Sequence, residues 1–244
     1  MMTDPRRVAP VPGARQKKPP VTVAADPFAP KMMGDPFLSC PPMPPITLAL
    51  IAANVIGFLL QSAVPGLLGP FALWPLGAAR ASGGQVGFDL WQVVTYAFLH
   101  GDLVHLLFNM FALYMFGGAL ERVYGARRYL LYYVVCVISA AIAQLLVAQM
   151  TGGIYPTVGA SGGVFGLLLA YAVYFPDSKL MLIFLPVPIP SRIFVAIYAV
   201  IELYLGVTGT QAGVAHFAHL GGMVGGAALL AYWGAFSSRV RRRY

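Results

Sequence analysis

The chain has 244 residues, of which 59% are hydrophobic and 10% are charged, and its mean hydropathy is +0.74. Soluble domains carry about a quarter of their residues as Asp, Glu, Lys or Arg, so the composition excludes an ordinary soluble enzyme. Aromatic residues make up 13% of the chain, which excludes low-complexity disorder. The composition therefore predicts a membrane protein, and its two cysteines are too few for a disulfide framework.

Proline and basic residues distinguish the N-terminal segment from the rest of the chain. The first 45 residues hold 12 of the 20 prolines and six of the 16 Lys and Arg residues, without an apolar repeat. Proline lacks the backbone donor that helices and sheets need, so we predict a disordered tail over residues 1–44. No apolar run follows the early basic residues, which argues against a signal peptide. Binding of a partner or of the lipid surface by this tail stays open.

Six apolar stretches follow the tail, each near the roughly 20 residues that a helix needs to cross a bilayer. They predict an all-α membrane protein, a six-transmembrane-helix bundle, with spans at 45–64, 103–119, 129–150, 156–175, 191–208 and 214–235. Residues 65–100 are less uniformly apolar and contain Trp74 and Trp91. We expect this loop to lie partly in the membrane interface. The short, proline-broken segment 180–190 is expected to be a connector near the membrane surface.

The basic residues predict how these spans are oriented. With six crossings both termini share one side, and 15 of the 16 Lys and Arg residues fall there, leaving only Arg80 on the other side. Positive loops face the cytosol, so both termini are predicted to be cytosolic. The expected organisation is the tail 1–44, a membrane domain 45–236 and a basic cytosolic C-terminal tail 237–244. Topology then explains the net charge of +8, and no nucleic-acid partner is expected.

Four polar residues fall in the outer half of three predicted spans. His105 and Asn109 are four positions apart and share one helix face. Ser161 and His219 belong to the fourth and sixth spans, each expected about 8 Å below the start of its helix. Polar groups inside spans are costly, so a cluster at one depth predicts a functional site.

The chemistry of these four residues is complementary. Small residues at 159, 162 and 163 and at 221, 222, 225 and 226 are typical of membrane helices that pack closely. Ser161 Oγ would then reach a ring nitrogen of His219, which pairs a serine nucleophile with a histidine general base and no third acid. His105 and Asn109 could donate hydrogen bonds to the oxyanion of a tetrahedral intermediate.

The other polar residues suggest no metal centre. His105, His216 and His219 could in principle bind zinc, but no carboxylate is expected beside them and an HExxH motif is absent. Neither a metal nor another cofactor is therefore predicted. His100 and His216 are expected to be hydrated residues at loop ends or close to the site. Glu202, deep in the fifth span, is expected to be protonated or hydrogen-bonded to a neighbouring helix rather than to relay protons.

Three motifs resemble the rhomboid family of intramembrane serine proteases: HxxxN at His105 and Asn109, GASG at 159–162 and AHLGG at 218–222. The resemblance covers about 45–235 and implies a six-helix bundle with a water-filled cavity open to the outside. It implies that a Ser–His dyad cleaves transmembrane segments of membrane proteins near the outer membrane face. Ser161 would be the nucleophile, His219 the general base and later acid, and His105 and Asn109 the oxyanion donors.

Two residues depart from the family pattern. Gln92 follows Trp91 where many members have arginine, which leaves open how the first loop is anchored. Phe165 stands four residues after Ser161, where some members have tyrosine. The aromatic face toward the catalytic imidazole is kept there, and the hydroxyl is lost.

The resemblance also implies a place and partners. A bacterial inner (plasma) membrane is expected, with the lipid bilayer and transmembrane protein substrates as partners, and the oligomeric state stays open. The alternative is a catalytically silent rhomboid-like protein that binds or escorts membrane proteins, although such relatives typically lack the serine or histidine. A transporter or channel would need polar residues along a path through the membrane, whereas this cluster stops in the outer half.

Overall fold

The computed structural model describes residues 42–66, 69–182, 185–209 and 215–235. These belong to one compact unit, Pro42–Tyr244. The predicted N-terminal tail lies outside the described residues up to position 41, and the predicted C-terminal tail 237–244 lies wholly outside them.

The described part of the chain is mainly helical, as its apolar stretches predict. Its longer helices are α1 (Pro45–Ala63), α4 (Leu103–Ala112), α5 (Gly118–Tyr124), α6 (Ala126–Thr151), α7 (Ser161–Tyr174), α8 (Ser191–Thr208) and α9 (His216–Tyr232). The π-helical turn η3 (Leu113–Gly117) joins α4 to α5.

Four helical segments of the described chain are long and apolar enough to cross a bilayer: α1, Leu103–Tyr124, α6 and α8. Helix α7 is apolar but has 14 residues, and α9 has 17. The fold is therefore a multi-pass helical membrane bundle, whereas the count of six crossings stays a prediction.

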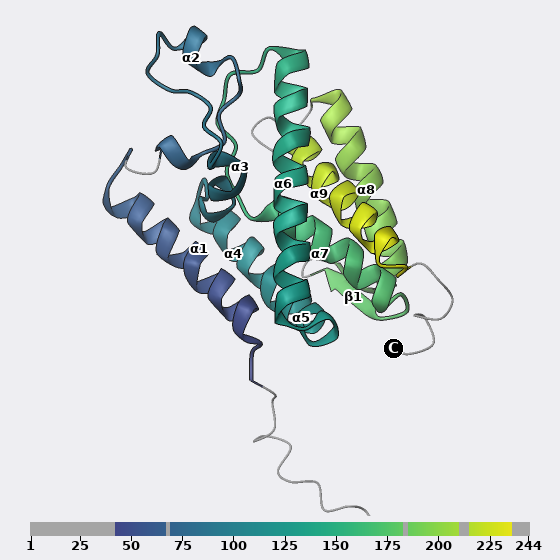
Figure 1. Cartoon of the computed structure of the whole chain (residues 1–244). Helices are drawn as coiled ribbons and strands as arrows, with labels where there is room; N and C mark the ends of the chain where they lie inside the picture. The colour runs from purple at the N-terminus through teal and green to yellow at the C-terminus, as the bar shows by residue number, and fades with distance from the viewer. Residues whose placement is uncertain (1–41, 67–68, 183–184, 210–214, 236–244) are drawn as a thin grey trace, which may run out of the picture. The chain divides into compact units, whose positions relative to one another are not determined.

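Helices α6, α7 and α9 pack against one another, and α8 packs against α7 and α9. Figure 1 shows α6 between α1 and α4 on one side and α8 and α9 on the other. The same view separates α2 (Ala78–Ala81) from strand β1 (Lys179–Leu182), which lie at opposite ends of the bundle.

A buried glutamine anchors the long loop between α1 and α4. The loop contains η1 (Gly69–Phe71), α2, α3 (Gln92–Thr95) and η2 (Tyr96–Phe98). The fully buried Gln92 accepts a hydrogen bond from the Trp74 backbone N–H through Oε1, at 3.0 Å. Its Nε2 donates to the carbonyls of Pro70 and Gly87, at 3.0 and 2.9 Å. The side-chain amide of Gln92 thus joins three backbone positions of the loop. These hydrogen bonds show how the loop is anchored with glutamine, and not arginine, at position 92.

The predicted connector 180–190 forms a β-hairpin. Strand β1 pairs antiparallel with β2 (Leu185–Pro190), with Lys179 opposite Pro190 and Leu180 opposite Ile189. Proline is tolerated in a two-stranded sheet because both strands are edge strands, in which some backbone positions make no hydrogen bond to the other strand. The hairpin leads directly into α8, where Ser191 Oγ donates to the carbonyl of Phe175 at 2.5 Å.

A buried carboxylate, that of Glu121 on α5, holds the start of α1. It is 3% exposed, and its oxygens accept from the backbone N–H groups of Ile46 and Thr47 at 2.9 and 2.7 Å. Oε2 also accepts from Thr47 Oγ1 at 2.8 Å. The first N–H groups of a helix have no partner within it, so a carboxylate at this end both satisfies them and complements the helix dipole.

Glycines allow the backbones of α7 and α9 to come into contact. A Cβ at Gly222 would overlap the backbone carbonyl of Gly162, which cannot move aside as a flexible side chain can. Gly221 and Gly225 face Ala143 and Ser139 of α6 with similarly little room. The small-residue pattern of the sequence therefore serves close helix packing, as predicted.

Replacing Gly222 with alanine tests this contact because two effects act in opposite directions. Helix propensity favours alanine by about 1 kcal/mol, whereas forcing a methyl group into a closed backbone contact costs roughly 1–3 kcal/mol or more. We expect Gly222→Ala to lower the free energy of unfolding, measured by denaturant titration in detergent micelles. Gly118→Ala is the matched control, since its Cβ would meet neighbours no closer than 3.7 Å. A Gly222→Ala protein as stable as this control would contradict the close approach.

His100, at the end of the long loop, is fully buried rather than hydrated as predicted. Gln61 on α1 holds its backbone, with Nε2 donating to the His100 carbonyl at 2.6 Å and Oε1 accepting its N–H at 3.3 Å. Neither ring nitrogen has a hydrogen-bond partner among the described residues, and the His105 ring lies 5.0 Å away, edge to face. Burial, and secondarily the neighbouring His105, lower the pKa of His100 to about 4.

This lowered pKa predicts a loss of stability in acid. The unfolded chain binds a proton at His100 near pH 6.5, whereas the folded protein binds it only near pH 4, so stability falls as the pH drops through this window. Wild type should therefore lose about 1–3 kcal/mol more between pH 7 and 4.5 than His100→Leu, measured by unfolding in detergent at both pH values. Equal losses in the two proteins would exclude His100 as the origin.

Candidate active site

Ser161 is the first residue of α7, which corrects its predicted depth. The sequence predicts a helix from 156, yet residues 152–160 are not helical and Ser161 begins the helix instead of lying about 8 Å below its start. Gly159 precedes it with φ +127°, a conformation that favours glycine. The Gly159 N–H donates to the carbonyl of Tyr96 at 3.0 Å, so the loop beyond α3 fixes where α7 begins.

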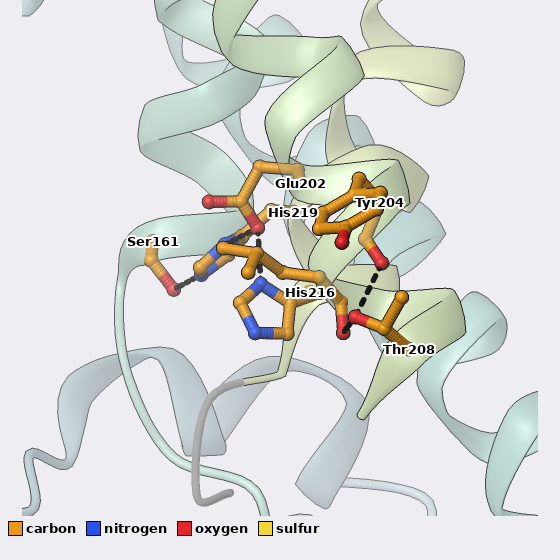
Figure 2. Close-up of polar contacts among 7 residues, drawn as sticks. Ser161, Glu202, Tyr204, Thr208, His216 and His219 are labelled. Carbon is orange, nitrogen blue, oxygen red and sulfur yellow. Dashed lines mark hydrogen bonds and ion pairs between the residues drawn. The ribbon is translucent and has the colours of Figure 1, made fainter. Parts of the chain in front are cut away.

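His219 lies in the first turn of α9 and faces Ser161 across the glycine contact. Its Nε2 is 2.8 Å from Ser161 Oγ, and its side chain is largely buried. Figure 2 shows this contact from α9 to the start of α7. The two residues that the sequence pairs as nucleophile and base are thus within hydrogen-bond distance.

An aromatic stack fixes the plane of the His219 ring. Phe165 of α7 is parallel to the imidazole, with ring centroids 4.2 Å apart and an interplanar angle of 5°. Tyr198 of α8 is stacked on the same phenyl group, with ring centroids 5.3 Å apart and an interplanar angle of 9°. The aromatic face expected at position 165 is therefore present, and the ring cannot tilt without disturbing α8.

His105 lies beside Ser161, and Asn109 lies one turn further along α4. A Cβ at Gly159 would be 2.8 Å from His105 Nε2 and 3.6 Å from Ser161 Oγ, so the imidazole and the hydroxyl lie on the same side of Gly159. The buried Asn109 donates from Nδ2 to the His105 carbonyl at 3.0 Å. Asp102 caps α4 by accepting the His105 backbone N–H at 2.7 Å.

Glu202 of α8 is the site residue that the sequence pattern did not reveal. It is 4% exposed, and its Oε2 lies 2.8 Å from Nδ1 of both His219 and His216. Figure 2 shows the two rings converging on this one oxygen. A partner on a neighbouring helix was expected for Glu202, but the expectation of no carboxylate beside the histidines was wrong. The sequence did offer one indication that Glu202 belongs to the candidate site, since it is an ionisable residue deep in a predicted span.

His216 is also buried, at 5% exposure, so of the two positions expected for it the structure shows the one close to the site and not a hydrated loop end. Its Nε2 has no hydrogen-bond partner among the described residues. Ligand-type atoms of Glu202, His216 and His219 lie within 4.8 Å of one another, a spacing that a metal ion can span. In this arrangement, however, hydrogen bonds already join Glu202 Oε2 to both Nδ1 atoms.

Comparisons with known proteins show which family the chain belongs to. The model of the Rhomboid domain family matches residues 87–236. Rhomboid protease GluP of Bacillus subtilis is 32% identical over 202 residues, which cover 81% of this chain and 37% of the relative. Rhomboid protease GlpG of an Enterobacter species is 32% identical over 129 residues, or 52% of this chain and 42% of the relative.

A human relative, Rhomboid-related protein 3, is 33% identical over 142 residues, covering 56% of this chain and 33% of its own length. The chain thus matches well under half the length of each of these relatives. The matched region contains both Ser161 and His219 together with all of α4 to α9. The chain belongs to the rhomboid family, and it is an integral multi-pass membrane protein.

Proposed function

We propose that this protein is an intramembrane serine endopeptidase that cleaves transmembrane segments of membrane proteins near the outer membrane face. The observation that carries the proposal is the 2.8 Å contact between Ser161 Oγ and His219 Nε2 within a helical membrane domain. A serine hydroxyl is a weak nucleophile until an adjacent base accepts its proton, and this contact has the geometry for that transfer. The relatives named as rhomboid proteases support the same reaction class.

In the proposed reaction His219 Nε2 takes the Ser161 proton as Oγ attacks the carbonyl carbon of the scissile bond. The resulting oxyanion is stabilised by His105 and Asn109 and by the backbone N–H of Ser161 at the positive end of α7. His219 then returns its proton to the leaving amine, and a serine ester remains. Water, deprotonated by the same imidazole, hydrolyses the ester and regenerates the Ser161 hydroxyl.

The membrane arrangement proposed here has six crossings, formed by α1, α4 to α5, α6, α7, α8 and α9. Arg122, Arg127 and Arg128 lie around the junction of α5 and α6, and Lys179 lies in β1, at the end of the bundle opposite Arg80 in α2. This asymmetry supports cytosolic termini and an outward-facing site. The bacterial inner membrane and the tail 1–44 are parts of the same proposal. A silent escort protein is disfavoured because both reacting side chains are present and in contact.

Labelling with a fluorophosphonate probe tests nucleophile and base together, without knowledge of the substrate. We expect wild type in detergent to be labelled and to cleave a single-pass transmembrane reporter in proteoliposomes. Ser161→Ala should abolish labelling, and both Ser161→Ala and His219→Ala should reduce cleavage by about 10³-fold or more, since each removes a group that acts in every turnover.

Ser62→Ala is the matched control, because this serine on α1 is exposed and donates only to the Phe58 carbonyl of its own helix. It should be labelled and active like wild type. Cleavage by purified Ser161→Ala at the wild-type rate would refute the assignment.

A further inference from the structure

We propose that Glu202 is a positioning residue that extends the Ser161–His219 pair into a Ser–His–Glu hydrogen-bonded chain, named the relay here although the serine proton stays on His219 and does not pass to Glu202. This inference rests on the proposed protease function and goes beyond it, because the sequence motifs predict a dyad with no third acid. The relay draws one residue from each of α7, α9 and α8.

The burial of Glu202 is the first step of the argument. A carboxylate in an apolar helix bundle is costly unless hydrogen bonds satisfy it. Glu202 is 4% exposed, and its Oε2 has two partners at 2.8 Å, the Nδ1 atoms of His216 and His219. An ionisable side chain inside a membrane span is costly, so a buried one is by default a candidate for a functional role.

The proton count at Oε2 is the second step. A single proton on this oxygen could be donated to only one of the two rings, so at least one ring must donate to it. An ionised Glu202 accepts from both Nδ1–H groups and leaves each Nε2 without a proton. That tautomer of His219 is the one that can accept the Ser161 hydroxyl proton, whereas the Nε2–H tautomer would aim a donor at Oγ.

Charge in the transition state is the third step. When His219 takes the serine proton it becomes an imidazolium, 2.8 Å from Glu202 Oε2 and stacked on Phe165. In these low-dielectric surroundings a carboxylate stabilises the new positive charge far more than it would in water. His216 holds the same oxygen from the start of α9, which limits the directions that the carboxylate can take.

The relay also depends on how α8 packs against α7 and α9. The side chains of α8 that are buried are Ser191, Val195 and Glu202, while Val200, Leu203 and Tyr204 are exposed. Glu202 and Tyr198 are the α8 residues that connect to His219, through the carboxylate and through the stack on Phe165. The base is therefore oriented only while α8 packs against α9.

The test compares Glu202→Gln, Glu202→Asp and Glu121→Gln with wild type in proteoliposomes, using a cleavable transmembrane reporter. Glu202→Gln should lower kcat by about 10²–10⁴-fold, because a neutral amide cannot stabilise the imidazolium as the carboxylate does. KM should change by less than about threefold, because the side chain at position 202 does not touch the substrate. Glu202→Asp keeps the negative charge on a shorter side chain, so its kcat should be at least about tenfold higher than that of Glu202→Gln. The rate of fluorophosphonate labelling should follow kcat across the series.

Glu121→Gln is the matched control, since Glu121 is the other buried carboxylate of the described residues, has equally short hydrogen bonds and lies away from Ser161. It should lower thermal stability and leave kcat near wild type. The inference is overturned if Glu202→Gln keeps the wild-type kcat, if Glu121→Gln loses as much kcat, or if Glu202→Asp is no faster than Glu202→Gln.

Two further controls distinguish the relay from a metal site and from a protein without protease activity. Activity that is lost with EDTA and regained with Zn²⁺ would make Glu202, His216 and His219 metal ligands and would also overturn the relay. Wild type that neither cleaves the reporter nor takes up label would refute the protease function itself. Active wild type with inactive Ser161→Ala and fully active Glu202→Gln would refute the relay alone.

Discussion

The contact between the backbones of Gly162 and Gly222 governs the rest of this structure. It allows α7 and α9 to approach more closely than any side chain would permit. Gly162 follows Ser161 directly, and Gly222 lies one turn beyond His219. The distance between the two helix backbones therefore decides whether the hydroxyl and the imidazole touch, and here they are 2.8 Å apart. In lipid, where the hydrophobic effect gives little drive for helix association, such close backbone packing is a main source of attraction.

Buried polar side chains then fix the elements around this contact, each through several hydrogen bonds. Gln92 anchors the long loop, Glu121 holds the start of α1, and Glu202 joins α8 to α9. A buried polar group without a hydrogen-bond partner costs free energy in apolar surroundings. Any arrangement that broke one of these pairings would therefore be less stable. Of these three side chains, Glu202 is the one whose hydrogen bond also orients the imidazole proposed as the general base.

The candidate site was only partly predictable from sequence. His105 and Asn109 are neighbours through helical spacing, and the glycine pattern around Ser161 and His219 indicated close packing, so all four could be proposed as site residues without a structure. Glu202 was missed as a partner of His219 because it lies on another helix, 17 residues earlier in the chain. Spacing along the chain says nothing about how a third helix is rotated toward the first two. The same limit explains why the sequence left open whether His216 and His100 are hydrated at loop ends or lie close to the site, where the structure buries both.

By itself, the sequence determined the membrane class and the approximate positions of most apolar helices, and it singled out the residues proposed for acyl-transfer chemistry. These follow from local composition and periodicity, which act over one or two turns of chain. Only the tertiary structure decided where α7 begins, how Gln92 anchors the first loop and which carboxylate faces the imidazole. Each of these depends on contacts between segments that are distant in the chain. Their geometry is set by packing in three dimensions, which no local pattern encodes.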